Sequence, residues 1–333
     1  MGNRGAALDR VRWGIVGVGD VTEHKSGPGF QRADRSELVA VMRRSGDKAA
    51  DYAERHGVAR WYDDADALIN DPDVDAVYVA TPPDSHHDYA LRAAAAGKPV
   101  YVEKPMARTA AECDAMIAAC VVADVPLFVA YYRRAMPRFG VVKKLLDGGA
   151  IGALRTVSIR LTKTPADVTT AGLPWRLRPE ISGGGLFVDL GSHTLDLLDW
   201  LLGPVTHVSG LAANQGKRYA AEDLVAGTFT FASGVHGVGL WSFDASEERD
   251  EVEITGTAGT VEFSTFGQEP LRVTDASGTR LIEATYPECV QLPLIQTVVD
   301  ALTGRGPCAS TGESAARTAR VVDTLLGEYR ALG

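Results

Sequence analysis

The feature that most constrains this chain is the alternation of short apolar runs with helical patterns over its first 131 residues. The runs are rich in valine and alanine, and capping residues and glycines mark the ends of the helices between them. Such alternation predicts an α/β Rossmann fold, a doubly wound parallel sheet whose ligands bind beyond the carboxyl ends of the strands. The expected strands are 11–16, 37–42, 58–62, 74–80, 100–102 and 127–131.

A glycine turn follows the first expected strand. Gly17 and Gly19 are the first two glycines of a G-x-G-x-x-G motif, and Thr22 stands at the third position. The first glycine permits the tight turn, the second lets the backbone approach a pyrophosphate, and the third position needs a small residue. Threonine is small but β-branched, and the Asp20 carboxylate must point away from a pyrophosphate. The turn predicts a dinucleotide site made by Gly17, Gly19, Asp20, Val21 and Thr22.

The end of the second expected strand bears on the choice of dinucleotide. Arg43, Arg44 and Ser45 stand where an NAD-binding chain has an acid for the ribose hydroxyls. Two guanidiniums and a hydroxyl suit a dianionic 2′-phosphate, which arginine binds with two hydrogen bonds. The alternative is a pair of solvated arginines at a strand end. Their place in the pattern favours NADP(H) over NAD(H).

Two further strand ends carry candidate cofactor ligands. Thr81 and Pro82 follow the expected strand 74–80, and Glu103 with Lys104 follows 100–102. His86 stands at the start of the next helix, where a histidine is commonly a capping or solvated residue. A lysine at a strand end is commonly a surface charge as well, so the pattern alone leaves the role of Lys104 open.

The second half of the chain has a different period. Residues 225–231 alternate every second residue, which predicts a large, mostly antiparallel sheet with one covered face. A helix at 137–146 is expected to cover that face, and the apolar residues of the other face suggest a homodimer or homotetramer. We expect domains at 1–131 and 132–333, with the C-terminal helix packing back on the first. The expected strands are 154–163, 207–213, 224–231, 235–243, 252–255, 260–266 and 271–285, and the closing helices are 291–303 and 313–332.

The stretch 183–203 holds the most unusual polar residues of this half. It opens with three glycines, ends at Gly203-Pro204 and reads as one helix covered with leucines. Asp189, His193 and Asp196 fall within a sector of about 60°. Buried ionisable groups need partners. The candidates here are a substrate, a cofactor, a metal or another part of the fold. We see no companion cluster of metal ligands and expect no metal.

Composition narrows the class of protein. The chain has 333 residues, of which 45% are hydrophobic, enough for two cores. Its net charge of −9 argues against nucleic-acid and membrane partners. The four cysteines show no C-x-x-C spacing, and no apolar run approaches the length of a membrane span. We therefore expect a cytoplasmic protein.

These pieces together resemble the glucose–fructose oxidoreductase/inositol dehydrogenase (Gfo/Idh/MocA) family over essentially the whole chain. The segments that carry the resemblance are the Gly17/Gly19 turn, Glu103-Lys104-Pro105, and the glycine triplet followed by Asp189-x-x-x-His193. In that family the lysine and the Asp/His pair converge at the nicotinamide. The resemblance thus implies a catalytic set of Lys104, Asp189 and His193, and a strained or cis peptide before Pro105. Tyr132 stands where many members have an asparagine.

The resemblance also implies a reaction. His193 is expected to move the hydroxyl proton during hydride transfer, with Lys104 polarising the oxygen and Asp189 orienting the pair. Trp175 and Arg176, in the long loop 164–182, are expected to wall the substrate pocket together with Tyr132. The expected function is an NADP(H)-dependent oxidoreductase acting on a secondary alcohol or carbonyl of a sugar, cyclitol or dihydrodiol-like compound.

Two other functions fit the same fold. One is a redox-neutral glycoside hydrolase that retains NAD, which Arg43 and Arg44 disfavour. The other is a non-catalytic nucleotide-sensing regulator, which would have no need of the proton-handling residues Lys104, Asp189 and His193.

Overall fold

The computed structural model describes residues 8–168 and 172–332, and the chain divides into two compact units. Among the described residues, unit 1 takes in 8–107, 111–136 and 287–313, and unit 2 takes in 108–110, 137–168, 172–286 and 314–332. Unit 1 thus runs past residue 131 to Met136 and is completed by a segment from near the C-terminus. No helix in the described part of the chain is long and apolar enough to cross a bilayer.

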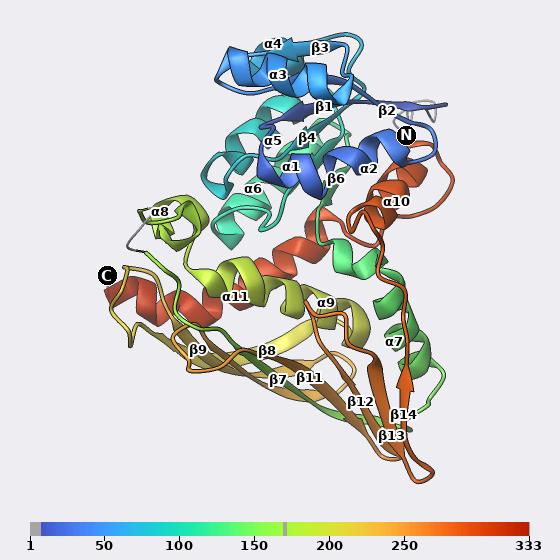
Figure 1. Ribbon diagram of the computed structural model, residues 1–333, viewed down its shortest axis with the longest axis vertical. Helices are drawn as coiled ribbons and strands as arrows, with labels where there is room; N and C mark the ends of the chain where they lie inside the picture. The colour runs from blue at the N-terminus through green and yellow to red at the C-terminus, as the bar shows by residue number, and fades with distance from the viewer. Residues whose placement is uncertain (1–7, 169–171, 333) are drawn as a thin grey trace. The chain divides into compact units, whose positions relative to one another are not determined.

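Unit 1 is built on a six-stranded parallel sheet with the order β3-β2-β1-β4-β5-β6 (Figure 1). β1 lies between β2 and β4, so the chain reverses its direction of winding there. This confirms the predicted Rossmann sheet, whose ligand site lies beyond the carboxyl ends of the strands at that reversal. The strands are β1 (Val11–Val16), β2 (Ser36–Met42), β3 (Arg60–Tyr62), β4 (Ala76–Val79), β5 (Val100–Val102) and β6 (Leu127–Val129).

Part of the core of unit 1 is a cluster of buried aromatic side chains from the sheet and α2. The Trp13 and Phe30 ring centroids lie 4.9 Å apart, Phe30 and Tyr78 4.8 Å, and Tyr78 and Tyr101 4.9 Å. The late helix α10 belongs to this unit: a Cβ on Gly29 would lie 2.5 Å from Ile295 Cδ1, so the glycine permits close packing there. The helices are α1 (Asp20–His24), α2 (Gly27–Arg32), α3 (Gly46–His56), α4 (Ala65–Ile69), α5 (His86–Ala95), α6 (Ala110–Val122) and α10 (Leu292–Leu302).

Unit 2 is built on an eight-stranded sheet with the order β14-β13-β12-β11-β7-β10-β9-β8. Every pairing is antiparallel except that of β7 with β10, which confirms the predicted, mostly antiparallel sheet. The strands are β7 (Leu154–Thr162), β8 (Val205–Ala213), β9 (Leu224–Phe231), β10 (His236–Ser242), β11 (Arg249–Gly256), β12 (Gly259–Phe263), β13 (Leu271–Asp275) and β14 (Gly278–Ile282).

The last expected strand, 271–285, is instead the hairpin β13–β14. The Asp275 carboxylate accepts a hydrogen bond from the Ser277 amide at 2.8 Å, and Gly278 has a φ of +117°. An aspartate that bonds the backbone two residues on, followed by a glycine in the left-handed region, is a turn signal that the sequence interpretation overlooked.

Helices cover one face of the unit 2 sheet (Figure 1). The Phe139 ring of α7 packs edge-on against Phe263 of β12 with centroids 5.8 Å apart, as predicted for the helix that opens this half. On β10, Trp241 is buried while its strand neighbours Leu240 and Val238 are exposed. The other face of the sheet is therefore open to solvent along this strand. The helices are α7 (Pro137–Asp147), α8 (Pro179–Ser182), α9 (Ser192–Leu202) and α11 (Gly312–Leu332), the last beginning in unit 1.

Candidate functional site

The glycine turn after β1 has the geometry that a dinucleotide needs. Gly17 has a φ of +97°, and a Cβ there would lie 2.6 Å from Thr81 Cγ2 and 2.9 Å from Thr81 N. A Cβ on Gly19 would meet no protein atom within 4 Å, so this glycine faces open space. The turn therefore packs against the β4 strand end while leaving the space beside Gly19 open, which fits the close approach of a pyrophosphate.

Thr22 closes this turn. Its hydroxyl accepts from the Gly19 amide and donates to the Gly19 carbonyl, both at 2.8 Å. Tyr52 donates from its hydroxyl to the Thr22 carbonyl at 3.0 Å. The side chain that departs from the glycine motif thus supplies two hydrogen bonds that glycine could not, and it is fully buried.

Arg43, Arg44 and Ser45 follow β2 directly. The Arg43 amide donates to the Tyr62 carbonyl at 3.1 Å, which ties the segment to β3. Among the described residues neither guanidinium forms an ion pair, and Arg44 and Ser45 are exposed. Two cations without a carboxylate partner at this strand end fit a phosphate on the adenosine ribose.

His86 connects the ends of β4 and β5. Its Nε2 lies 2.7 Å from the Thr81 carbonyl oxygen and its Nδ1 lies 2.9 Å from the Pro105 carbonyl oxygen. The ring is 1% exposed, and this burial lowers the pKa of His86. Both ring nitrogens thus face the loops on which the cofactor is expected, and direct contact of the ring with a cofactor stays a prediction.

Glu103 fixes the backbone that carries Lys104. Its carboxylate accepts from the Tyr78 hydroxyl, from Gln291 Nε2 at 2.7 Å and from the Lys104 amide at 3.0 Å. The Lys104–Pro105 peptide is cis, which the resemblance implied. Gln291 lies 188 residues beyond Glu103, and nothing in the sequence indicated this contact.

In unit 2, Asp189 lies on an unusual helical turn. The expected helix forms, but residues Phe187–Gly191 wind as a π-helix before α9 begins. A Cβ on Gly191 would lie 2.5 Å from the Phe187 ring, and Phe187 packs edge-on against Trp241 with centroids 5.0 Å apart. Isolated π-helical turns within helices are frequent at functional sites, and this one carries the aspartate singled out from the sequence.

The structure brings Asp189 together with the two loop residues predicted to wall the pocket. Arg176 Nε lies 3.3 Å from Asp189 Oδ2, and the Arg176 guanidinium lies 4.4 Å from the centroid of the Trp175 ring. The Asp189 side chain is 16% exposed and that of Arg176 38%. A carboxylate, a guanidinium and an indole thus form one continuous, partly accessible polar surface.

His193 lies one turn further on and is 4% exposed. The Phe266 ring stands almost perpendicular to the imidazole, at 82° and 5.9 Å between centroids. The Asp250 carboxylate holds this loop by accepting from the Thr265 amide at 3.1 Å and the Phe266 amide at 2.6 Å. The sequence interpretation missed Phe266 because it placed the residue inside the expected strand 260–266, whereas β12 ends at Phe263.

Asp196, the third member of the predicted polar stripe, has a partner within the fold. Thr318 Oγ1 of α11 lies 3.5 Å from Asp196 Oδ1, and Arg317 binds the nearby Asp199 at 2.6 and 2.8 Å. Asp196 is 1% exposed. This carboxylate therefore joins α9 to α11. Its partner is another part of the fold, which was one of the alternatives that the sequence left open.

The remaining predicted substrate residue, Tyr132, belongs to unit 1. It is 8% exposed, and the Arg133 guanidinium lies 4.8 Å from the centroid of its ring. Arg134 Nη1 donates to the Ala309 carbonyl at 3.3 Å, which ties this segment to the returning chain. Among the residues that the structure describes, no group of three or more metal-ligating side chains is arranged to hold an ion.

Comparison with known proteins identifies both halves of the chain. The model of the oxidoreductase family with an NAD-binding Rossmann fold matches residues 11–131, and the GFO/IDH/MocA C-terminal domain matches residues 139–262. The chain is 39% identical over 323 residues to Oxidoreductase P35 of Formosa agariphila, covering 96% of this chain and 99% of the relative. It is 30% identical over 320 residues to 1,5-anhydro-D-fructose reductase of Ensifer adhaerens, covering 91% of each.

Solved structures agree with these relatives. Aldose–aldose oxidoreductase from Caulobacter crescentus, complexed with glycerol, matches with a TM-score of 0.86 at 27% identity, over 97% of this chain and 98% of that one. Levoglucosan dehydrogenase in complex with NADH and levoglucosan matches in fold, with a TM-score of 0.87 at 23% identity over 98% of each chain. The chain therefore belongs to the GFO/IDH/MocA family and is an oxidoreductase with a nicotinamide cofactor.

Proposed function

We propose that this protein transfers hydride between NADP(H) and a secondary alcohol or carbonyl of a sugar, cyclitol or dihydrodiol-like compound. The observation that carries the proposal is the surface on which Arg176 holds Asp189 one helical turn before His193. Relatives named for reduction of 1,5-anhydro-D-fructose and dehydrogenation of D-apiose support a carbohydrate-like substrate. Because these names describe oxidation and reduction, they favour hydride transfer over glycoside hydrolysis or nucleotide sensing.

The catalytic set in this proposal is Lys104, Asp189 and His193. A nicotinamide cofactor held at the glycine turn would supply the hydride acceptor for oxidation of the carbinol carbon, and the hydride donor for the reverse reaction. His193 takes the hydroxyl proton as the C–O bond gains double-bond character, and Lys104 stabilises the negative charge that develops on the oxygen. Asp189 orients His193 and balances the positive charge that the imidazole gains.

Substrate recognition is assigned to Trp175, Arg176, Tyr132 and Phe266. An aromatic face beside hydrogen-bonding groups is a common surface for sugar-like compounds, since their C–H faces are apolar and their hydroxyls are polar. Trp175 and Phe266 supply aromatic faces, and Arg176 supplies N–H donors. We therefore infer a polyhydroxylated, uncharged substrate about the size of a single sugar ring.

Two alanine variants test the catalytic set. With a panel of sugars, inositols and diols and NADP⁺, absorbance at the reduced-nicotinamide band identifies the substrate. Lys104→Ala and His193→Ala are expected to lower kcat by about 10²–10⁴-fold, the usual contribution of a positioned acid–base group. NADPH affinity should stay close to that of the wild type. An unchanged kcat in either variant would remove that residue from the set.

The cofactor preference is assigned to Arg43, Arg44 and Ser45. Titration of NADPH and NADH against protein fluorescence should show tighter binding of NADPH. The double variant Arg43→Ala/Arg44→Ala should lose that difference while retaining NADH binding, because its glycine turn is intact. Tighter binding of NADH by the wild type would refute the assignment.

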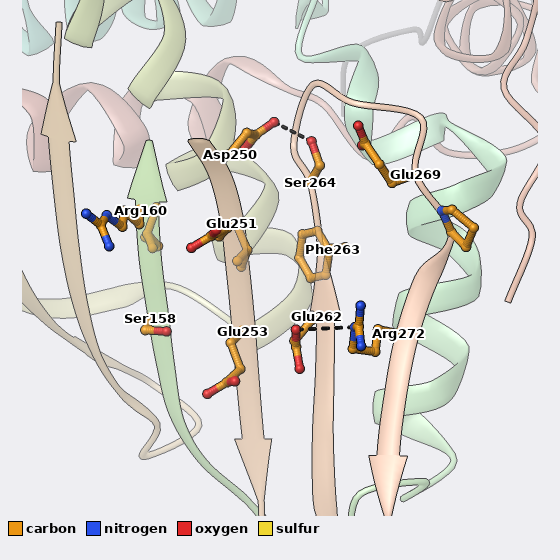
Figure 2. A pocket seen from close by; sticks show the side chains of 13 residues that line it. Ser158, Arg160, Asp250, Glu251, Glu253, Glu262, Phe263, Ser264, Glu269 and Arg272 are labelled. Atoms are coloured by element: carbon orange, nitrogen blue, oxygen red, sulfur yellow. Dashed lines mark hydrogen bonds and ion pairs between the residues drawn. The ribbon is translucent and has the colours of Figure 1, made fainter. Parts of the chain in front are cut away.

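The open face of the unit 2 sheet is assigned to self-association. Leu211, Ala226 and Leu240 stand opposite one another on β8, β9 and β10, and the row continues through Arg160 and Glu251. A hollow of about 450 Å³ adjoins the charged part of the row between β7, β11, β12 and β13, with Glu253 and Glu262 beside it (Figure 2). A mixed apolar and charged face of this kind suits a second copy of the chain.

Light scattering tests this association. A mass of two or four chains is expected for the wild type and a mass of one chain for Leu240→Asp. A wild-type mass of one chain would contradict the association. We also infer a reducing, cytoplasmic compartment, because the described cysteines Cys120, Cys289 and Cys308 are buried thiols outside any disulfide.

A further inference from the structure

A buried carboxylate that the reaction does not use lies against the glycine triplet. Glu222 lies near the end of the connection between β8 and β9 and is 1% exposed. Its Oε1 accepts a hydrogen bond from the Gly185 amide at 2.7 Å across 37 residues of sequence. A charged group is rarely buried so completely without a specific task.

The glycines make room for this carboxylate. A Cβ on Gly184 would lie 3.2 Å from both carboxylate oxygens of Glu222 and 2.4 Å from Val188 Cγ2. A Cβ on Gly185 would lie 2.7 Å from the Glu222 carbonyl oxygen. Gly184 and Gly185 therefore have a steric role, because a side chain at either position would collide with Glu222 or its neighbours.

The same glycine connects Glu222 to the candidate catalytic aspartate. The Asp189 amide donates to the Gly185 carbonyl at 3.3 Å, which is the first hydrogen bond leading into the π-helical turn. The Asp189 carboxylate then meets Arg176 at 3.3 Å. Glu222, Gly185, Asp189 and Arg176 thus form one series of contacts, all within unit 2.

We propose that Glu222 is a positioning residue, whose ionised carboxylate holds Gly185 and thereby sets the place of Asp189 at the start of the π-helical turn. The inference rests on the proposed function, since it gives Asp189 a role in the reaction. A charge-assisted hydrogen bond to an amide is stronger than a neutral one, so the ionised carboxylate fixes Gly185 more firmly than the protonated acid does.

The surroundings of Glu222 let both forms exist near neutral pH. Burial raises the pKa of Glu222 to about 7, and the neighbouring Asp223 acts in the same direction. The Gly185 amide and the Arg330 guanidinium of α11 act against this rise. The Arg330 guanidinium also donates hydrogen bonds to the Asp323 carboxylate and to the Gly183 carbonyl, each at 2.6 Å. The other titratable groups that face Glu222 are Tyr219 and Tyr329.

The first test reads the contact itself. In the full-length protein the amide ¹⁵N–¹H resonance of Gly185 is followed from pH 5.5 to pH 8.5. The resonance should shift with a midpoint near 7 in the wild type and in the control Glu54→Gln, whose side chain is exposed on α3. It should not titrate in Glu222→Gln, which keeps a neutral acceptor of the same shape. A Gly185 resonance that does not titrate in the wild type would overturn the proposal.

The second test reads the consequence for catalysis. At pH 8.5 the kcat of Glu222→Gln should be about tenfold below that of the wild type, the difference between a charged and a neutral hydrogen bond. The two values should converge below pH 6, where the wild-type carboxyl is protonated, and KM should change little. Equal kcat values at pH 8.5, with a titrating Gly185, would overturn the positioning role. A wild-type protein inactive on every substrate would count against the proposed function, while the Gly185 resonance would still decide the contact.

Discussion

Arg176 and Asp189 form an ion pair in which neither partner is fully exposed. This partial burial decides how strongly the pair can fix the two side chains. An exposed pair of this length contributes little because water screens it, whereas a partly buried one restricts both side chains. The guanidinium also lies over the Trp175 ring, so its plane is fixed from a second direction. At the scale of single residues, Asp189 is therefore held by a guanidinium whose own orientation is fixed by the Trp175 ring.

Removing this guanidinium should impair the site more than the fold. Arg176→Ala is expected to lower kcat/KM by about 10–100-fold, because a hydrogen bond to a charged group contributes about 1.5–3 kcal/mol. Arg176→Lys should recover part of the loss, since lysine restores the charge without the planar fork. Arg155→Ala, an exposed arginine on β7, serves as the matched control and should leave kcat/KM unchanged. Steady-state kinetics would contradict the assignment if both alanine variants behaved alike.

Thr22 offers a second prediction for a single side chain. Thr22→Val keeps the shape but loses both hydrogen bonds to Gly19, so the NADPH dissociation constant should rise about tenfold, as expected for the loss of one or two such bonds. Thr22→Ser keeps the hydroxyl and should bind NADPH nearly as the wild type does. Fluorescence titration of the three proteins measures the effect, and equal affinities would show that the turn is fixed by other contacts.

At the scale of elements, the sequence revealed structure where the signal was local. The strands β4 and β5 are continuous apolar runs and β1 is interrupted by Arg12, and the parallel sheet follows from their alternation with helices. The π-helical turn could not be predicted, because it depends on Phe187 packing against Trp241, a residue of the distant strand β10. The contact of Gln291 could not be predicted for the same reason, because its partner Glu103 lies far away in the sequence. Phe266 was missed because the expected strand 260–266 ran past the end of β12 at Phe263.

The π-helical turn itself can be tested with one methyl group. In Gly191→Ala the new Cβ would lie 2.5 Å from the Phe187 ring, so the turn must shift or the ring must leave Trp241. We expect a loss of about 1–3 kcal/mol in the free energy of unfolding, the usual effect of overpacking, together with a fall in kcat.

A second glycine provides the control for this substitution. A Cβ on Gly327 of α11 would meet no atom within 4 Å, so Gly327→Ala should stabilise the protein by about 0.5–1 kcal/mol. Chemical denaturation of both variants measures the two effects. A Gly191→Ala protein as stable and active as the wild type would show that the turn tolerates an ordinary α-helix.

At the scale of the whole molecule, the two protonation states of the buried Glu222 have opposite effects: the ionised form is proposed to support activity, and the protonated form favours folding. Its pKa in the folded protein, about 7, lies above the ordinary value of 4.5, so folding favours the protonated carboxyl. The stability that this preference contributes is fully present below pH 4.5 and is lost as the pH rises through 7. The ionised form that holds Gly185 is therefore also the form that burial penalises.

This opposition predicts a pH-dependent difference in stability between two proteins. Glu222→Gln cannot ionise, so at pH 8 it should be more stable than the wild type by up to about 3 kcal/mol, while at pH 4.5 the two should be alike. Native-state hydrogen exchange of the α9 amides reports on unit 2 specifically, and comparing the proteins at equal pH cancels the intrinsic exchange rate. A stability difference that does not change with pH would mean that Glu222 keeps one protonation state throughout. If instead the variant gains stability at pH 8 while losing kcat there, one carboxylate both destabilises the fold and orients the site, a trade that active sites commonly show.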